Sequence, residues 1–311
     1  MVIKNLVIAG GGPTGLITCG AISEMICQKI INTTKIEKVY ATSIGAALGV
    51  LICLDYNWSD DIYNFFVMRP WEKTISIESD DIMDIFNGGC YLDKLFNVIK
   101  YDIFLKLLEV CDITEETTLL DLYNITNKEL YMYTININTA KILELSYKTT
   151  PTLSLIKALC MTSCLPPIFR PIEYEGEYYM DGGAIVNYPL NNCINNNKKE
   201  ETFGFNMSGI YLDIFNPNIS NMFYYLQHLY NMSFNIISTA HHQENIENEI
   251  TLKRKGDATD INMWTNFFTK KDFRHDMWMD GVNQIKEFLK NKPLLVNEAN
   301  QANQAKPLHN D

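Results

Sequence analysis

Hydrophobic positions near the start of the chain follow a strand pattern and then a helix pattern, and this order occurs twice. Residues 3–9 contain the apolar run Leu6-Val7-Ile8, which is typical of a short buried strand, and residues 14–30 form a helical segment that is apolar on most faces. Residues 36–42 are rich in β-branched and aromatic side chains, which favours a second strand, and a helical pattern over residues 45–54 follows directly. Two such strand–turn–helix units predict an α/β fold whose parallel sheet is covered by helices.

Further along the chain, helical and strand patterns alternate. We expect helices over most of 59–110 with a break at 87–89, paired strands at 130–137 and 140–146, and a helix at 153–164 that ends before Pro166. A hairpin at 173–183 and a polar surface loop after Pro189 follow. We then expect a strand at 202–215 and helices at 219–242 and 274–290. The last residues have no apolar period, so we expect one domain over 1–291 and a disordered tail over 292–311.

Composition and charge exclude several classes of protein. The chain has 311 residues and is 47% hydrophobic, which is typical of a globular protein rather than a disordered or fibrous one. Its formal net charge of −11 argues against a nucleic-acid-binding surface and against a polybasic membrane anchor. The eight cysteines have no zinc-site spacing, and we find neither a signal-peptide pattern nor an apolar run that could span a bilayer. We therefore expect free thiols in a soluble cytoplasmic protein that contacts membranes at most peripherally.

The stretch NLVIAGGGPTGL, residues 5–16, places a glycine-rich turn between the first strand and the first helix. Gly10, Gly12 and Gly15 match the G-x-G-x-x-G pattern of dinucleotide-binding turns. Such a site also needs an acidic residue at the end of the second strand, where it binds the ribose hydroxyls, and here Ser43 stands at that position. The sequence therefore disfavours the alternative of an FAD- or NAD-binding oxidoreductase.

The stretch ATSIG, residues 41–45, places a serine between small residues at the second strand-to-helix turn. A sharp turn of this kind raises the serine at the tip of the strand, where a nucleophile would stand, although a helix N-cap is the other role of such a serine. Because the two turns follow neighbouring strands, the N–H groups of Gly10 to Gly12 are expected to point toward Ser43 Oγ. That arrangement would supply a nucleophile and an oxyanion hole for acyl transfer.

A serine nucleophile needs a base, and the chain offers histidines and one well-placed aspartate. None of the five histidines lies in a recognisable catalytic motif; they are His228, His241, His242, His275 and His309. Asp181 follows a strand-like run and precedes two glycines, which allow a tight turn with close backbone approach. Plain Asp-Gly turn chemistry is the alternative interpretation of this stretch.

Taken together, the motifs resemble those of the patatin-like phospholipases. The similar segments are GGGPTG at 10–15, ATSIG at 41–45 and DGG at 181–183, with the longer stretches 118–126, 149–190 and 276–289. The resemblance implies a three-layer α/β/α sandwich with a mainly parallel central sheet. It also implies hydrolysis of fatty acyl esters, of a phospholipase A or lysophospholipase type, by a Ser–Asp dyad that uses no cofactor and no metal ion. By position, it implies Ser43 as nucleophile, Asp181 as general base, Gly10, Gly11 and Gly12 as the oxyanion hole, and Gly15, Gly45, Gly182 and Gly183 as supporting residues of the turns.

Three positions depart from the usual motifs of the family, and they leave an alternative function open. Ala9, Thr14 and Ala41 stand where the family often has aspartate, a basic residue and glycine. The loss of a positive charge at Thr14 and of a glycine at Ala41 motivates the alternative of a catalytically weak protein that binds lipid or a partner.

The implied partners are a phospholipid or another acyl ester and, transiently, a membrane surface, with no nucleic acid. Residues 219–234 contain an apolar helical stripe that is a hypothetical membrane-docking face, although core packing is the more usual role of such a stripe. Its members are Met222, Phe223, Leu226, Leu229, Tyr230 and Phe234.

Overall fold

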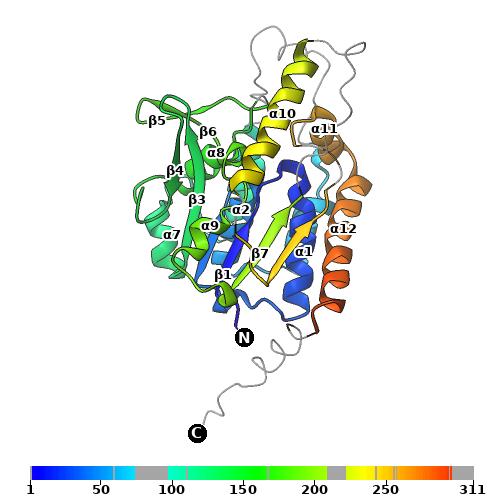
Figure 1. Cartoon of the computed structure of the whole chain (residues 1–311). Helices are drawn as coiled ribbons and strands as arrows, with labels where there is room; N and C mark the ends of the chain where they lie inside the picture. Colours follow the sequence, from blue (N-terminus) through cyan, green and yellow to red (C-terminus); the bar gives the residue numbers. More distant parts are fainter. Residues whose placement is uncertain are drawn as a thin grey trace.

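A mainly parallel sheet of eight strands forms the centre of the protein (Figure 1). The computed structural model describes residues 2–58, 60–73, 97–109, 111–166, 168–208, 222–241, 244–254, 256, 258–293 and 295. The strands are β1 (Asn5–Ile8), β2 (Lys38–Ala41), β3 (Glu129–Asn136), β4 (Lys141–Leu145), β5 (Ile172–Tyr174), β6 (Glu177–Asp181), β7 (Thr202–Met207) and β8 (Glu249–Leu252).

The parallel part of the sheet follows the pairing order β3-β2-β1-β7-β8, and β4, β5 and β6 add antiparallel pairs at the β3 end. β1 lies between two parallel neighbours, and all four of its residues are buried. A strand covered on both faces needs apolar side chains on both faces, which explains the continuous apolar run at the start of the chain. The prediction of a parallel, helix-covered sheet is confirmed.

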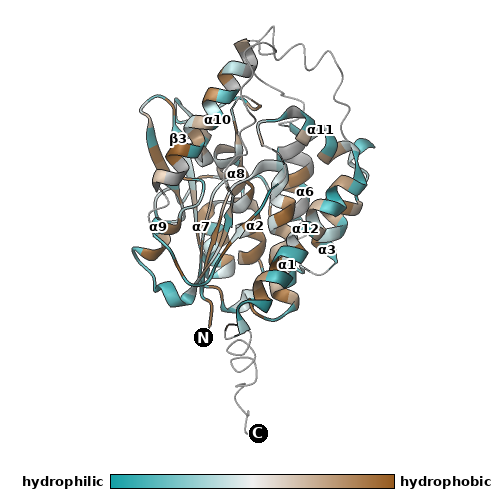
Figure 2. Ribbon diagram, turned by 45° about the vertical axis from the view of Figure 1, so that its right-hand side comes forward, coloured by the Kyte–Doolittle hydropathy of each residue, from teal (hydrophilic) through white to brown (hydrophobic). Residues whose placement is uncertain are grey.

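Helices cover both faces of the sheet. The longer helices are α1 (Gly15–Cys27), α2 (Ile44–Cys53), α7 (Leu119–Thr126), α8 (Leu155–Ser163), α10 (Met222–His241), α11 (Ile261–Thr269) and α12 (Lys271–Lys290). The shorter segments are α3 (Asp61–Tyr63), α6 (Lys106–Glu109), α9 (Leu190–Ile194) and the π-helical turns Asn64–Met68 and Val98–Leu105. In Figure 2 the sheet is seen nearly edge-on, with α1, α2 and α12 on one side and α9 on the other. The chain therefore forms a three-layer α/β/α arrangement.

Two glycines bring the backbones of α1 and α12 into close contact. A Cβ atom on Gly20 would lie 2.1 Å from the carbonyl oxygen of Trp278, and one on Gly281 would lie 1.9 Å from that of Ile17. These separations are shorter than any real carbon–oxygen contact, so larger residues would force the helices apart. The packing ties α12 to α1, the helix that follows the glycine turn at residues 10–12.

Several expectations from the sequence differ from the structure or lie outside the described residues. The polar stretch after Pro189, expected to be a loop, contains the short helix α9, and the sequence patterns did not predict β8. Residues 74–96 with the break at 87–89, residues 209–221, and the tail from 296 lie outside the described residues. Within the described part of the chain, no helix is long and apolar enough to cross a bilayer.

Candidate active site

The glycine turn and the serine turn lie at the same edge of the sheet. β1 and β2 are parallel neighbours whose last residues, Ile8 and Ala41, pair with each other. Gly10, Gly11 and Gly12 follow β1, and Ser43 follows β2. The carboxyl ends of parallel strands meet at one edge, where α/β proteins place their ligands.

Asp181 reaches this edge because β2 and β6 lie end to end along one side of β3. Residues 134–136 of β3 pair with both β4 and β6, so these two strands take opposite sides of β3. Met132 pairs with both β4 and β2, so β2 shares a side with β6. Ala41 lies opposite Met132 and Asp181 lies opposite Thr134, so the turn that leaves β2 meets the last residue of β6.

Ser43 lies in the turn from β2 to α2 with a strained backbone. Its φ and ψ are 57° and −132°, a region that L-residues rarely adopt at a cost on the order of 1–3 kcal/mol. Ser43 occupies the N-cap position of α2, but its hydroxyl makes no capping hydrogen bond to the helix. The N-cap interpretation of this serine therefore fails, and the strained turn leaves Oγ for another partner.

The partner of the Ser43 hydroxyl is Asp181. Ser43 Oγ donates a 2.7 Å hydrogen bond to Asp181 Oδ2, and Asp181 Oδ1 accepts one of 2.7 Å from the N–H of Gly183. The two residues are only 6% and 2% exposed. Burial raises the pKa of the Asp181 carboxyl to about 7, and the hydrogen bonds from Ser43 and Gly183 oppose this shift. The arrangement pairs a serine hydroxyl with a carboxyl group that titrates near neutral pH.

The glycine turn lies directly against this pair. A Cβ atom on Gly10 would lie 3.0 Å from Ser43 Cβ and 2.7 Å from Asn187 Oδ1, so only glycine fits there. The N–H of Gly10 donates to the carbonyl of Asn187 at 3.1 Å, so this group is already engaged. Within the described residues, no acceptor takes the N–H of Gly11 or Gly12. In this structure the N–H groups of Gly11 and Gly12 are therefore available to a bound oxygen, whereas that of Gly10 is engaged with Asn187.

The four glycines expected to support the turns stand at points of close approach. A Cβ atom would lie 2.6 Å from the Ile44 side chain at Gly15, 2.6 Å from the Ile8 carbonyl oxygen at Gly45, 2.2 Å from the Tyr133 carbonyl oxygen at Gly182, and 2.9 Å from Asp181 Oδ1 at Gly183. They let the turns carrying the serine and the aspartate press against β1 and β3.

Two threonines hold the serine turn in place, and the sequence did not indicate either of them. Thr162, near the end of α8, accepts the N–H of Ser43 at 3.0 Å and donates to the carbonyl of Tyr133 at 2.5 Å. Thr42 donates to the carbonyl of Val186 at 2.7 Å. Thr162 lies 119 residues from Ser43 in the chain, and no spacing in the sequence marks such a distant pair. Only the folded chain brings these groups together.

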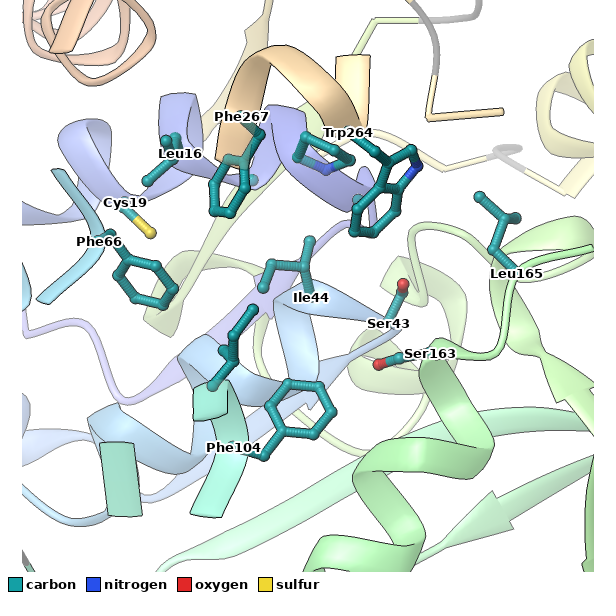
Figure 3. Close-up of a pocket in the computed structure, with 14 residues that line it drawn as sticks. Leu16, Cys19, Ser43, Ile44, Phe66, Phe104, Ser163, Leu165, Trp264 and Phe267 are labelled. Atoms are coloured by element: carbon teal, nitrogen blue, oxygen red, sulfur yellow. The ribbon is translucent and has the colours of Figure 1, made fainter. Parts of the chain in front are cut away.

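An apolar pocket opens at Ser43. Figure 3 shows the hydroxyl groups of Ser43 and Ser163 at one end of the pocket and Leu16, Cys19 and Phe66 at the other. Further apolar lining comes from Pro13, Ile44, Ile103, Phe104, Leu165, Trp264 and Phe267. The Ser163 hydroxyl is buried, and no group in the described residues accepts or donates a hydrogen bond to it. An apolar group placed beside the Ser43 hydroxyl would therefore meet a mainly apolar lining.

A second, more polar opening reaches the same pair from another side. Its lining includes the glycine turn, Ser43 and Asp181. It also contains Asn187 from the segment between β6 and α9, and Tyr230 and Phe234 from α10. Arg254 and Thr259 come from the segment before α11. Ser43 thus stands between an apolar pocket and an opening with polar side chains.

The histidines whose side chains the structure describes lie elsewhere. His228 and His275 line neither the apolar pocket nor the polar opening. His275 Nδ1 lies 2.8 Å from the hydroxyl of Tyr63, at the exposed side of α12. In the described part of the chain, no group of three or more His, Cys, Asp or Glu side chains is placed to hold a metal ion.

Comparison with known proteins finds a matching family model and two similar viral proteins. The family model described as patatin-like phospholipase matches residues 6–194. "Probable lipid hydrolase 463L" of Invertebrate iridescent virus 6 is 29% identical over 204 residues, which cover 64% of this chain and 66% of that protein. An uncharacterised protein of Acanthamoeba polyphaga mimivirus is 27% identical over 204 residues, which cover 60% of each chain. The match therefore spans less than two thirds of either viral relative.

A solved structure shares the fold. VipD from Legionella pneumophila superposes with a TM-score of 0.56 at 16% identity, over 94% of this chain and 67% of that one.

Proposed function

Because the chain belongs to the patatin-like phospholipase family, we propose that it hydrolyses fatty acyl esters of lipids, with Ser43 as nucleophile and Asp181 as general base. The observation that carries this proposal is the 2.7 Å hydrogen bond from Ser43 Oγ to Asp181 Oδ2, formed where an apolar pocket ends. A nucleophile and a base within hydrogen-bonding distance are the first requirement of acyl transfer.

The pKa of Asp181 suits the role of base. A free aspartate, with a pKa near 3.9, is a weak base for a serine hydroxyl. Burial raises the pKa of Asp181 to about 7, which increases its basicity while leaving a large ionised fraction at neutral pH. The catalytic advantage comes at the cost of burying a charge, which is the usual compromise at such sites.

The reaction proceeds in two halves. Asp181 takes the proton of Ser43 Oγ while Oγ attacks the ester carbonyl carbon, and the tetrahedral intermediate collapses with departure of the alcohol, which takes the proton from Asp181. In the second half, water attacks the acyl group on Ser43 and loses a proton to Asp181. Ser43 Oγ leaves and recovers that proton, and the fatty acid is released.

The N–H groups of Gly11 and Gly12 stabilise the oxyanion of each tetrahedral intermediate. Both residues lie in the lining that also contains Ser43 and Asp181. Backbone donors that are already oriented need no reorganisation when the charge develops, and one such donor is worth about 3 kcal/mol.

The two openings divide the substrate between them. The acyl chain lies in the apolar pocket, which ends at Ser43. The alcohol part lies in the opening that contains Asn187, Arg254 and Thr259. A polar head group is therefore accommodated on the side where the leaving group departs, which favours a phospholipid or lysophospholipid as substrate.

Fluorophosphonate labelling and ester turnover test the proposal. The purified protein is expected to hydrolyse a chromogenic acyl ester and to be labelled by a fluorophosphonate at Ser43, whereas Ser43→Ala is neither active nor labelled. Ser163→Ala is the matched control, because Ser163 lines the same pocket without a carboxylate partner, so that variant should be labelled like the wild type. Labelling at another serine would place the nucleophile elsewhere and contradict the assignment. A folded wild type without turnover would favour a protein that only binds lipid.

A further inference from the structure

Helix α10 carries the largest group of exposed apolar side chains in the described part of the chain. Over the described residues, twelve large hydrophobic side chains are exposed, and five of them lie on α10. They are Met222 at 71%, Tyr225 at 43%, Leu226 at 55%, Met232 at 38% and Ile236 at 62% exposed. At 3.6 residues per turn, these five positions fall within about a third of the helix circumference. They form one continuous stripe, here called the outer face of α10.

The side of the helix next to the outer face belongs to the candidate active site, since Tyr230 lies one turn after Leu226. Tyr230 and Phe234 line the polar opening together with Ser43 and Asp181. Asn231 is buried, and its Oδ1 accepts a hydrogen bond from Thr259 at 3.3 Å. Leu229 lies among the outer-face positions and is half-buried, whereas Tyr230 and Phe234 line the opening, so the stripe noted in the sequence is divided between two adjoining sides of the helix. The expected core packing is not what the described residues show: Met222 and Leu226 are exposed, Tyr230 and Phe234 line the opening, and the side chain of Phe223 lies outside the described residues.

The helix is also uncharged. None of its 20 residues is Asp, Glu, Lys or Arg, although charged residues make up 20% of the chain. Charged side chains are expensive to place in the hydrocarbon region of a lipid layer, and this helix has none to place there. The chain as a whole carries a formal charge of −11, and α10 has no Lys or Arg with which to bind an anionic lipid.

From the position, exposure and charge of this helix we infer that its outer face docks on a lipid surface without net charge. Such a surface is a layer of zwitterionic phospholipid. The inference deepens the proposed function and rests on it for the lipid substrate. Figure 1 shows α10 at the carboxyl edge of the sheet, extending beyond the other labelled helices. Docking there brings the polar opening beside Tyr230 and Phe234 to the lipid.

A second copy of the chain fits the same observations less well. A partner molecule that covered the outer face would stand beside the opening to Ser43 and hinder the approach of lipid. A lipid surface buries the same apolar side chains and at the same time supplies the substrate.

Vesicle binding separates docking from catalysis. Ser43→Ala protein, which cannot hydrolyse the vesicles under the proposed mechanism, is mixed with phosphatidylcholine vesicles, and the bound fraction is measured by flotation. Adding Met222→Gln, Leu226→Gln and Ile236→Gln should reduce the partition coefficient at least about tenfold. The matched control is Leu120→Gln, Ile125→Gln and Ile142→Gln, three exposed apolar residues on α7 and β4, and it should bind like its parent.

Turnover with intact Ser43 provides the second measurement. The triple variant of α10 should hydrolyse a soluble short-chain ester at the parental rate, because these residues line neither opening, and vesicle lipid at least about tenfold more slowly. Equal losses on both substrates would overturn the inference. A protein that binds vesicles through α10 but hydrolyses no ester would refute the proposed function and support the docking surface.

Three binding results would overturn the docking surface itself. One is a parent protein that does not bind phosphatidylcholine vesicles, and another is an equal loss of binding in the two triple variants. A third is that the parent protein forms a dimer, seen by light scattering, and that the α10 triple variant is monomeric while the control variant remains dimeric. The outer face would then be covered by a second copy of the chain. Replacing part of the phosphatidylcholine by phosphatidylserine should not strengthen binding, and binding that rises with anionic lipid and falls with salt would contradict a neutral surface.

Discussion

Ser43 Oγ lies 2.7 Å from Asp181 Oδ2, although 138 residues separate them in the chain. The contact exists because β2 and β6 meet end to end along one side of β3, so that each strand delivers its residue at the same level of the sheet. Both side chains are buried, and neither depends on a histidine whose side chain the structure describes. The predicted activity, pH dependence and stability of the variants below follow mainly from this contact.

Asp181→Asn should lower kcat at least about a hundredfold, because it keeps the shape of the side chain and removes the base. His228→Gln and His275→Gln should stay within a few-fold of the wild type, since neither side chain lines the site. Initial rates with a chromogenic acyl ester measure both effects. A histidine variant as inactive as Asp181→Asn would replace the dyad by a triad.

The rate should depend on pH through Asp181. The reaction needs the ionised carboxylate, and burial raises the pKa of this group to about 7. We therefore expect kcat/KM to rise with pH below about 7, by close to tenfold per unit well below the pKa, and to level off above it. A profile recorded from pH 5 to pH 9 with a soluble ester tests this, and a flat profile over the acidic half would contradict it.

The same pKa predicts how stability changes with pH. In the unfolded chain Asp181 ionises near pH 3.9, whereas in the folded protein it keeps its proton up to about pH 7. The folded state therefore loses stability from this group as the pH rises between these two values, because it must then bury a charge. Asp181→Asn has no charge to bury, so its Tm relative to the wild type should be higher at pH 8 than at pH 5. A Tm difference independent of pH would argue against a buried, titrating Asp181.

Gly11→Val should reduce kcat far more than it changes KM. The added side chain disturbs the N–H donor next to Ser43, and the lost interaction forms mainly in the transition state, where it is worth about 3 kcal/mol. The φ of Gly11, at 176°, lies outside the left-handed region, but a Cβ atom there would lie 2.7 Å from Thr14 Oγ1, so the Thr14 side chain must move to admit valine. Steady-state kinetics and a melting curve distinguish catalytic loss from unfolding. An unchanged kcat would place the oxyanion hole elsewhere.

Thr162→Val should lower both the activity and the stability, whereas Thr162→Ser should restore them. Valine removes the oxygen that accepts the N–H of Ser43, and a buried N–H without a partner costs about 1–3 kcal/mol. The strained turn at Ser43 then loses a contact that holds it, so we expect kcat to fall by about tenfold or more. If valine leaves kcat unchanged while lowering Tm, Thr162 supports the fold without positioning the nucleophile.

The sequence alone determined the parts of this protein that depend on neighbours in the chain. The strand–turn–helix units, the glycine turn after β1 and the serine turn after β2 follow from local patterns, because each pattern reports the burial and the backbone freedom of a few consecutive residues. Asp181 was also identified from its place between a strand and two glycines, with the family resemblance distinguishing it from an ordinary hairpin turn.

Only the tertiary structure decided the features that join distant segments. The carbonyl that engages the N–H of Gly10 belongs to Asn187, and the acceptor for Ser43 belongs to Thr162, so the sequence could not tell which glycine N–H groups are free or what holds the serine turn. The raised pKa of Asp181 comes from burial by elements throughout the chain. The apolar pattern of α10 favours core packing, although an exposed stripe has the same pattern. Which side of that helix meets the protein depends on where the turn at residues 182–184 and Thr259 lie, and a periodicity of hydrophobic residues contains no information about that.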